Sequence, residues 1–360
     1  MPAVEGTTGF PHNSSPKPAP KPIPEPVRWR HETLEILDQR LLPGTVHYDV
    51  QTGVHSVATA IRELRVRGAP AIGIAAAYGV VLAAREAGGG DSLQQRLTSA
   101  AATLTSARPT AVNLAWAVKR VMARFDPTLD ADTNYLRLRT EAEALHAEDR
   151  RICRAIGAAG VELIKEGSSI MTHCNAGALA VSELGTATAP MYLAHRSGIR
   201  FRVFANETRP VLQGARLTAW ELDRAGIDVT LVCDNAAGHL MAGGQVDLVI
   251  VGADRVTANG DVVNKIGTAT LAILCDHFDI PFYVACPSST FDPDTPRGVD
   301  VEIEERPAEE VRSFEGLEIP GHIQIRNPGF DVTPRALVTG FVTNRGLLGP
   351  PYPDTLSVLK

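Results

Sequence analysis

A cysteine lies between a histidine and an asparagine, where an apolar run ends and a stretch of small residues begins. The three residues are His173, Cys174 and Asn175, in the sequence MTHCNAGALA. A thiol at this position can act as a nucleophile, a metal ligand, a proton carrier or a small buried side chain. A helix expected to begin just after Cys174 would favour the thiolate through its dipole, and this supports a chemical role.

An aspartate follows a second apolar run in the same way, because Asp254 comes directly after VIVGA. Alone, an aspartate at this point is expected to cap the next turn. The carboxyl ends of parallel strands meet at one edge of a sheet, so we expect Asp254 near Cys174, where the pair is typical of acid–base catalysis. An acid that acts near neutral pH needs a raised pKa, which burial in an apolar pocket would provide.

The other histidine and cysteine positions are poorer candidates for chemistry. His173 has no second histidine at ligand spacing, so we expect a hydrogen-bonded structural role and no metal site. Cys233, Cys275 and Cys286 lie in or beside apolar runs and are assigned to packing. The sequence contains neither GxGxxG nor GxxxxGK[ST], so a classical dinucleotide site or P-loop is unsupported, and no cofactor is expected.

Several segments place positive charge or amides at expected helix starts, where anions bind. In RGAPAIG, Arg67 supplies charge, Gly68 lets the backbone approach a ligand, and Pro70 suits a first helical turn. The other such residues are Arg108, Gln213, Asn264 and Lys265. Each alone is as well explained by an ordinary loop or cap. Together they indicate a phosphorylated small molecule as the ligand.

The elements that must position these residues change character along the chain. Residues 28–50 contain two strand-like segments with a turn at Pro43 and Gly44, and residues 54–148 have helical spacing. A longer helical segment over 131–166, with Gly167 as its C-cap, is expected to bridge two domains. Beyond it, short Val- and Ile-rich runs alternate with helical stretches, among them 176–198. This alternation predicts an α/β fold with a doubly wound parallel sheet.

Composition limits the class of protein. The net charge of -6 gives no basic footprint for nucleic acid, and the five cysteines contain no CxxC pair, which argues against a disulfide framework. No signal peptide is recognised, and no apolar stretch reaches the ~20 residues of a membrane helix. We expect a cytoplasmic protein with no membrane contact. Four segments are predicted: a disordered proline-rich tail (1–27), a mainly helical domain with short strands (28–150), a catalytic α/β domain (151–348) and a C-terminal tail (349–360).

Five stretches of the chain carry a resemblance to a known family. They are RGAPAIG, THCNAGALA, ETRPVLQGARLTAWEL, VGADRV with NGDVVNKIGT, and STFD. In this order they resemble the S-methyl-5-thioribose-1-phosphate isomerase family, the sugar-phosphate isomerases of methionine salvage. The wider superfamily includes regulatory subunits of the translation-initiation guanine-nucleotide exchange factor and ribose 1,5-bisphosphate isomerases.

The resemblance implies roles for individual residues. It implies that Cys174 is the catalytic cysteine and that Asp254 is the catalytic aspartate and proton donor. The substrate contacts that it implies are Arg67, Gly68, Ala69, Arg108, Gln213, Asn264 and Lys265. It also implies a homodimer, a smaller N-terminal domain, a Rossmann-like C-terminal domain, a phosphorylated sugar as substrate, and neither metal nor cofactor.

Departures from the family pattern keep alternatives open. Asn206 stands where members often have cysteine, and VCDNAAGHLM replaces a more usual stretch. The substrate expected is 5-methylthioribose 1-phosphate, with 5-deoxyribose 1-phosphate and ribose 1,5-bisphosphate as alternatives. A non-catalytic regulatory subunit would keep the fold and lose the chemistry, and the presence of both Cys174 and Asp254 speaks against it.

Overall fold

Two compact units make up the chain, and each is described by itself. The computed structural model describes residues 19–85, 92–108, 112–314, 316–352 and 354–359. Unit 1 comprises the described residues of 1–22, 156–175 and 190–360. Unit 2 comprises those of 23–155 and 176–189. The long helix α5 (Ala131–Gly160) therefore belongs to unit 2 up to residue 155 and to unit 1 beyond it.

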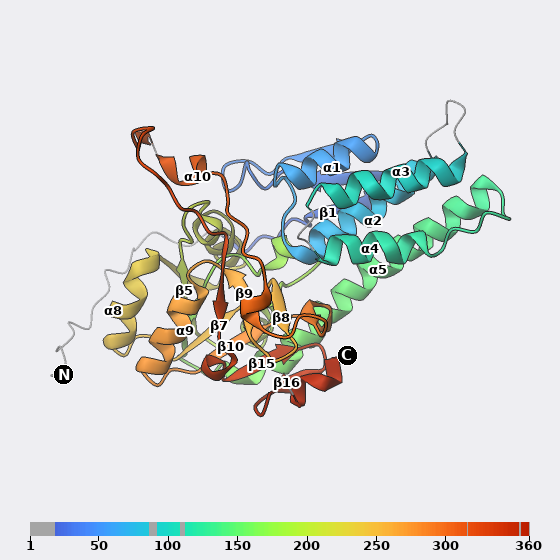
Figure 1. Cartoon of the computed structure of the whole chain (residues 1–360). Helices are drawn as coiled ribbons and strands as arrows, with labels where there is room; N and C mark the ends of the chain where they lie inside the picture. The colour runs from blue at the N-terminus through green and yellow to red at the C-terminus, as the bar shows by residue number, and fades with distance from the viewer. Residues whose placement is uncertain (1–18, 86–91, 109–111, 315, 353, 360) are drawn as a thin grey trace. The chain divides into compact units, whose positions relative to one another are not determined.

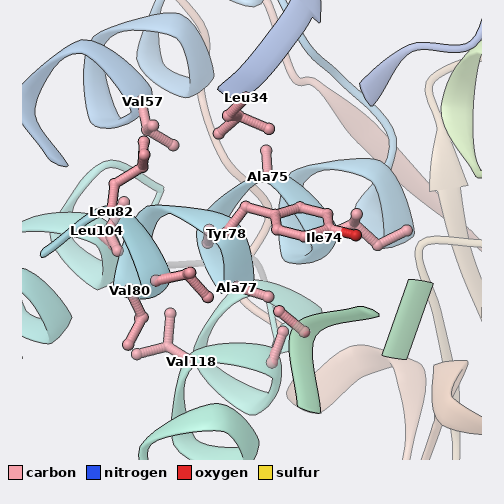
Figure 2. Packing of buried hydrophobic residues seen from close by; sticks show 14 of the residues in the cluster. Leu34, Val57, Ile74, Ala75, Ala77, Tyr78, Val80, Leu82, Leu104 and Val118 are labelled. Atoms are coloured by element: carbon pink, nitrogen blue, oxygen red, sulfur yellow. The ribbon is translucent and has the colours of Figure 1, made fainter. Parts of the chain in front are cut away.

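Unit 2 is built around helix α2 (Ala69–Arg85), which is buried from Ala71 to Ala84. A helix that is apolar all round has no solvent face and takes the centre of a core. Helices α1, α3 and α4 pack against it, and Figure 2 shows Val57, Leu104 and Val118 from these helices close to its side chains. The other elements are β1 (Val27–Arg30), β2 (Thr33–Leu37), β3 (Tyr48–Gln51), α1 (Val54–Arg62), α3 (Leu93–Ser106), α4 (Val112–Met122) and η2 (Ala178–Ala180).

The sequence predicted most of the elements between residues 28 and 166, with two differences. The helical spacing over 54–148 is confirmed by α1 to α5, and two predicted strands correspond to β2 and β3. Strand β1 was missed, and it pairs with β2 in an antiparallel sheet of order β1-β2-β3. Gly167 was predicted as the C-cap of the long helix, but α5 ends at Gly160 and a single 3₁₀ turn, η1 (Val161–Leu163), follows.

Unit 1 contains a seven-stranded sheet in which all neighbours but one pair are parallel (Figure 1). Its order is β16-β15-β10-β7-β4-β5-β6, and only β15 and β16 are antiparallel. The strands are β4 (Ser169–Thr172), β5 (Arg202–Asn206), β6 (Asp228–Val232), β7 (Leu248–Val251), β10 (Phe282–Ala285), β15 (Gly340–Thr343) and β16 (Gly346–Leu348). The first five of these were predicted from their apolar runs.

The strand order reverses beside β4. From β4 the chain adds β5 and β6 on one side, then returns and adds β7, β10 and β15 on the other. Ile170 of β4 accordingly pairs with Val203 of β5 and with Leu248 of β7. In open α/β sheets, ligands bind outside the carboxyl ends of the strands at such a reversal. The carboxyl ends of β4 and β7 therefore mark the position for a site.

A four-stranded sheet of order β11-β8-β9-β14 also belongs to unit 1. Its strands are β8 (Arg255–Thr257), β9 (Val262–Lys265), β11 (Phe291–Asp292) and β14 (Phe330–Thr333). The remaining elements of the unit are α6 (Ala189–Arg196), α7 (Trp220–Arg224), α8 (Ala237–Ala242), α9 (Thr268–His277), α10 (Glu309–Arg312), β12 (Ser313–Phe314), β13 (Leu317–Glu318), the π-helix η3 (Gly214–Ala219), and the 3₁₀ turns η4 (Asp234–Ala236), η5 (Ser288–Thr290), η6 (Gly298–Asp300), η7 (Arg335–Leu337) and η8 (Thr355–Leu359). Among the residues described, no helix combines the length and apolar character that crossing a membrane requires.

The helix predicted over 176–198 is largely absent. Only the 3₁₀ turn η2 and helix α6, which starts at Ala189, form there. Leu184 and Gly185 both have positive φ angles, which no right-handed helix tolerates, and the N–H of Thr186 bonds back to the carbonyl of Ala176. The segment therefore folds as an irregular loop that packs with unit 2.

Part of the predicted N-terminal tail belongs to the fold. Residues 1–27 were expected to form a disordered tail, and 1–18 lie outside the described residues. However, Val27 is buried in β1, the carbonyl of Pro26 accepts the N–H of Leu37, and that of Glu25 accepts the Tyr48 hydroxyl. The predicted boundary at residue 27 is therefore several residues too late.

A chain that begins at Arg28 should consequently melt below one that begins at Ala19. The shorter chain loses the buried Val27 and at least four hydrogen bonds, among them those of Lys21 and Pro22 with Arg224, together worth about 5 kcal/mol. The expected loss of Tm is roughly 5–10 °C by differential scanning calorimetry. Equal melting temperatures would show that residues 19–27 contribute nothing to the fold.

Candidate functional site

The predicted site residues divide between the two units. Unit 1 carries Cys174, Gln213, Asp254, Asn264 and Lys265. Unit 2 carries Arg67, Gly68, Ala69 and Arg108.

Cys174 and Asp254 follow the two strands at which the sheet order reverses. Cys174 comes two residues after β4 ends at Thr172, and Asp254 comes three residues after β7 ends at Val251. Strands β4 and β7 are direct neighbours and run parallel, so both residues leave the same edge of the sheet. The sequence-based expectation that these two strand ends lie side by side is met within unit 1.

Cys174 has a backbone conformation that is rare for a residue with a side chain. Its φ is 60°, in the left-handed region, and its side chain is partly exposed. Its N–H donates to the hydroxyl of Thr208 at 2.8 Å, and its carbonyl accepts the hydroxyl of Thr218 at 2.6 Å. The predicted helix start after Cys174 is wrong, because only the three-residue turn η2 follows it closely. Thiolate stabilisation by a helix dipole is therefore not available from this segment.

His173 is a buried structural residue, as the sequence predicted. Its Nε2 lies 2.8 Å from the carbonyl oxygen of Ile266, and Nδ1 lies 3.4 Å from Nδ2 of Asn206. Burial lowers the pKa of His173 because a charged imidazole is poorly solvated there. A neutral ring with hydrogen on Nε2 satisfies both contacts. His173 therefore links the end of β4 to the segment before α9 and to the end of β5.

Asp254 is held through its main chain and exposes its side chain. Its N–H donates to the carbonyl of Val263 on β9 at 3.0 Å. The expected burial in an apolar pocket is not observed, because Asp254 lies in the short loop between β7 and β8 and is exposed. The hydrogen bond from Asp254 to Val263 places the end of β7 beside β9, the strand that carries Asn264 and Lys265.

Asn264 and Lys265 end β9 just before helix α9. The amide of Asn264 is buried and donates to the hydroxyl of Thr268 at 3.0 Å. The Lys265 ammonium donates to the carbonyl of Gly329 at 2.8 Å and lies 4.4 Å from the centre of the Phe330 ring. An ammonium has three donors, so this arrangement orients Lys265 and leaves capacity for an anion. The predicted helix start after these residues is confirmed by α9.

Gln213 lies immediately before the π-helix η3. It is buried, and its Oε1 has no hydrogen-bond partner among the described residues. A buried amide oxygen without a donor costs roughly 1–3 kcal/mol, so such an atom is expected to receive a donor from a ligand. The next residue, Gly214, touches the end of β5: a Cβ there would stand 1.7 Å from the carbonyl oxygen of Asn206. Only glycine permits this approach.

In unit 2 the predicted anion segment has the expected form. Helix α2 begins at Ala69, directly after Arg67 and Gly68, with Pro70 in its first turn. Gly68 has a φ of 89°, and a Cβ on it would stand 2.3 Å from the carbonyl oxygen of Ala180, so no other residue fits. Arg108 follows the end of α3 at Ser106, and residues 109–111, which separate it from α4, lie outside the described residues.

The remaining cysteines divide between core and surface. Cys275 and Cys286 are buried, which confirms their assignment to packing, and Cys153 is buried as well. Cys233 is exposed, so its assignment to packing is wrong: it directly follows β6, the edge strand of the sheet. Within the described ranges, no cluster of three or more His, Cys, Asp or Glu residues has the geometry of a metal site.

Sequence reasoning missed the side chains that hold the site in place. Thr208 and Thr218 lie in stretches that the sequence singled out, but nothing in their spacing shows that both bond to Cys174. Asp331 carried no signal at all. It lies on β14, and its carboxylate accepts the N–H of Gly267 at 2.7 Å and that of Ala269 at 3.1 Å, which caps helix α9. Only the folded chain brings residues so distant in sequence together.

Comparisons with known proteins agree over nearly the whole chain. A model of the initiation factor 2 subunit family matches residues 65–350. Methylthioribose-1-phosphate isomerase of Gemmatimonas aurantiaca is 49% identical over 341 residues, which cover 94% of this chain and 97% of that protein. The crystal structure of 5-methylthioribose 1-phosphate isomerase from Pyrococcus horikoshii OT3 has a TM-score of 0.88 and 40% identity, covering 94% of this chain and 96% of that one. Translation initiation factor eIF-2B, subunit delta, from A. fulgidus has a TM-score of 0.84 and 42% identity, covering 92% and 99%.

Asp331 predicts a pH dependence of stability. Burial raises its pKa to about 6, and the N–H donors of Gly267 and Ala269 do not offset this. Between pH 4 and 6 the unfolded chain therefore releases a proton that the folded chain retains, so the contribution of Asp331 to stability falls as pH rises. The free energy of unfolding of the wild type, minus that of Asp331→Asn, should decrease from pH 4 to 7 in urea titrations.

Asp261 provides the opposite case as a control. Burial raises its pKa, but N–H donors from Arg335, Asn259 and Gly298 outweigh burial and hold the pKa below its usual value. The free energy of unfolding of the wild type, minus that of Asp261→Asn, should therefore increase with pH. Parallel curves for wild type and Asp331→Asn would contradict the raised pKa.

Proposed function

The chain belongs to the initiation factor 2 subunit family and to the methylthioribose-1-phosphate isomerases, and we propose that it converts 5-methylthioribose 1-phosphate to 5-methylthioribulose 1-phosphate, the isomerase step of methionine salvage. The observation that carries this is near-half identity across almost the full length of an isomerase, with Cys174 and Asp254 at the reversal of the sheet. Turnover of this sugar phosphate by the purified protein tests it.

The chemistry needs two kinds of proton transfer. Phosphate on the anomeric oxygen blocks simple ring opening, so the ring oxygen must be protonated without loss of phosphate. We assign this step to Asp254, which then recovers a proton from the O2 hydroxyl and returns to its starting state. The Asp254 side chain is exposed, so we propose that bound substrate displaces water from this carboxyl during the reaction.

The second transfer moves hydrogen from C2 to C1. On an enolate route, the Cys174 thiolate takes the proton from C2, a double bond forms between C1 and C2, and the thiol returns the proton to C1. Both groups end in their original protonation states, so the sequence balances without oxidant or reductant. On a hydride route the hydrogen passes directly from C2 to C1, and Cys174 acts only through its charge or position.

The proposed substrate contacts are supported by local geometry. Gln213 offers a buried amide oxygen that a sugar hydroxyl can donate to, and Lys265 is oriented by Gly329 and Phe330. Arg67, with the N–H groups at the start of α2, has the chemistry of a phosphate site. We propose the same substrate-binding role for Gly68, Ala69, Arg108 and Asn264.

Finer aspects of the organisation are also proposals. The strand order of unit 1 supports a Rossmann-like, doubly wound domain, and the helical content of unit 2 supports a smaller, mainly helical N-terminal domain over 28–150, with 151–348 catalytic and 349–360 a tail. We propose a cytoplasmic homodimer, formed through the C-terminal domain. Light scattering at micromolar concentration should give twice the chain mass of 38.5 kDa.

A second function has one observation in its favour. The solved protein named as an initiation factor subunit is as similar in sequence as the solved isomerase. A regulatory subunit would bind sugar phosphate without turning it over. Parallel assays with 5-methylthioribose 1-phosphate, 5-deoxyribose 1-phosphate and ribose 1,5-bisphosphate separate this possibility from isomerases of different substrate preference.

Cys174→Ser and Asp254→Asn should each lower kcat by about two orders of magnitude or more, while a product analogue still binds. The serine hydroxyl is too weak an acid to exchange protons near pH 7, and the amide cannot exchange them at all. Cys233→Ser and Asp276→Asn, which change exposed side chains of the same unit, serve as controls. Near-normal kcat in Cys174→Ser would return that residue to a packing role.

Arg67→Ala and Lys265→Ala should each weaken the binding of substrate by roughly 10- to 100-fold, since a charge-assisted contact is worth about 1.5–3 kcal/mol. Isothermal titration with the substrate in the Asp254→Asn background measures this without turnover. Arg62→Ala and Lys165→Ala remove exposed charges of the same type, one from each unit, and should have no effect. Unchanged affinity in both test variants would place the phosphate elsewhere.

A further inference from the structure

The left-handed backbone of Cys174 presents a physical problem. A φ of 60° costs an ordinary residue roughly 1–3 kcal/mol, and such residues persist only where the surroundings hold them. Glycine adopts this conformation freely but has no thiol. Relaxation to an extended conformation would rotate the Cα–Cβ bond and move Sγ away from its present position. The fold must therefore supply contacts that hold this main chain.

Two threonine hydroxyls supply these contacts, one on each side of Cys174. The hydroxyl of Thr208 accepts the Cys174 N–H at 2.8 Å and donates its own hydrogen to the carbonyl of Asn206 at 3.0 Å. The hydroxyl of Thr218 donates to the Cys174 carbonyl at 2.6 Å and accepts from Nδ2 of Asn175 at 3.1 Å. Each hydroxyl thus uses its one hydrogen and a lone pair consistently. Both threonines are buried.

The two threonines are themselves fixed by separate elements. Thr208 follows β5 and has a φ of 67°, which is unusual for a β-branched residue. The Asp234 carboxylate, which follows β6, accepts the N–H of Thr208 and that of Arg209, both at 2.7 Å. Thr218 lies in η3, which packs on the end of β5 through Gly214. The ends of β4, β5 and β6 are therefore tied together at Cys174.

We propose that the hydroxyls of Thr208 and Thr218 clamp the main chain of Cys174 in its left-handed conformation and thereby aim its thiol at the substrate. Neither hydroxyl reaches the reacting atoms in this role, so both are positioning residues. The inference rests on the proposed catalytic role of Cys174. A displaced acid–base group loses much of its rate advantage, because proton transfer requires correct distance and alignment.

The test uses isosteric variants of the full-length chain. Thr208→Val and Thr218→Val keep the shape of each side chain and remove only the hydroxyl, whereas Thr208→Ser and Thr218→Ser keep the hydroxyl. The clamp predicts that each valine variant lowers kcat by about 10- to 100-fold with KM changed less than about twofold, and that each serine variant recovers kcat to within about threefold. If Thr208→Val does not fold, Thr218→Val carries the test.

Thr343 provides a matched control. It is buried in the same unit, and its hydroxyl also joins two main-chain groups: it donates to the carbonyl of Gly346 at 2.9 Å and accepts the N–H of Arg345 at 3.0 Å. It ends β15, which β10 and β7 separate from β4. Thr343→Val should lower Tm by an amount similar to the test variants and leave kcat near wild type.

The outcomes distinguish the clamp from the proposed function. Wild-type kcat in both folded valine variants, with Cys174→Ser inactive, overturns the clamp and leaves the catalytic role of Cys174 standing. A loss of kcat that serine does not recover, or an equal loss in Thr343→Val, also overturns it. Normal turnover in Cys174→Ser removes the catalytic role, and the clamp with it.

Discussion

Strand β4 is hydrogen-bonded to β5 on one side and to β7 on the other, and the arrangement of the candidate site depends on this double pairing. Parallel strands end at the same edge of a sheet. Because the strand order reverses beside β4, the chain continues toward β5 after β4 but toward β10 after β7, on the opposite side. Cys174 and Asp254 lie two and three residues beyond these two ends. Backbone pairing in the sheet therefore places the segments that carry these two residues at adjacent strand ends.

Part of the backbone strain in the described residues lies next to that pairing. Cys174, Thr208 and Leu212 all have φ angles near 60°, although none is glycine. Such conformations disagree with local preference and survive because the surrounding fold over-determines them. Here the opposing contacts are short and specific: two threonine hydroxyls, the Asp234 carboxylate, and the close contact between Gly214 and Asn206. Strain of this kind is typical of sites where a side chain must point in one direction.

Burial gives the supporting residues different charge states. His173 is held neutral by burial and serves as a hydrogen-bonding link, whereas Asp331 has a pKa raised to about 6 while it caps α9. The chain of contacts runs from His173 through Ile266 to the start of α9, and from Asp331 to the same helix start. Asn264 and Lys265 lie directly before this point. Their position therefore depends on groups that take no part in the proposed chemistry.

The sequence by itself determined the parts of this protein that depend on local pattern. Apolar runs located β4, β5, β6, β7 and β10, and helical spacing located the helices of unit 2. The reactive residues at strand ends indicated the edge of the sheet at which we propose a site. These signals are local because burial of a strand or helix requires a fixed spacing of apolar residues. Long motifs identified the family and the reaction, because each motif joins many specific residues in a fixed local order.

Tertiary structure decided what local pattern does not encode. The stretch 176–188 has a helix-like composition but folds as a loop, because its contacts with the rest of unit 2 outweigh helix propensity. Strands β8, β9, β14 and β15 are short and were not recognised. The exposure of Asp254, the threonine bonds to Cys174 and the cap by Asp331 each depend on residues far apart in the chain. Such contacts leave no periodic trace in sequence, since only the folded backbone brings their partners within hydrogen-bonding distance.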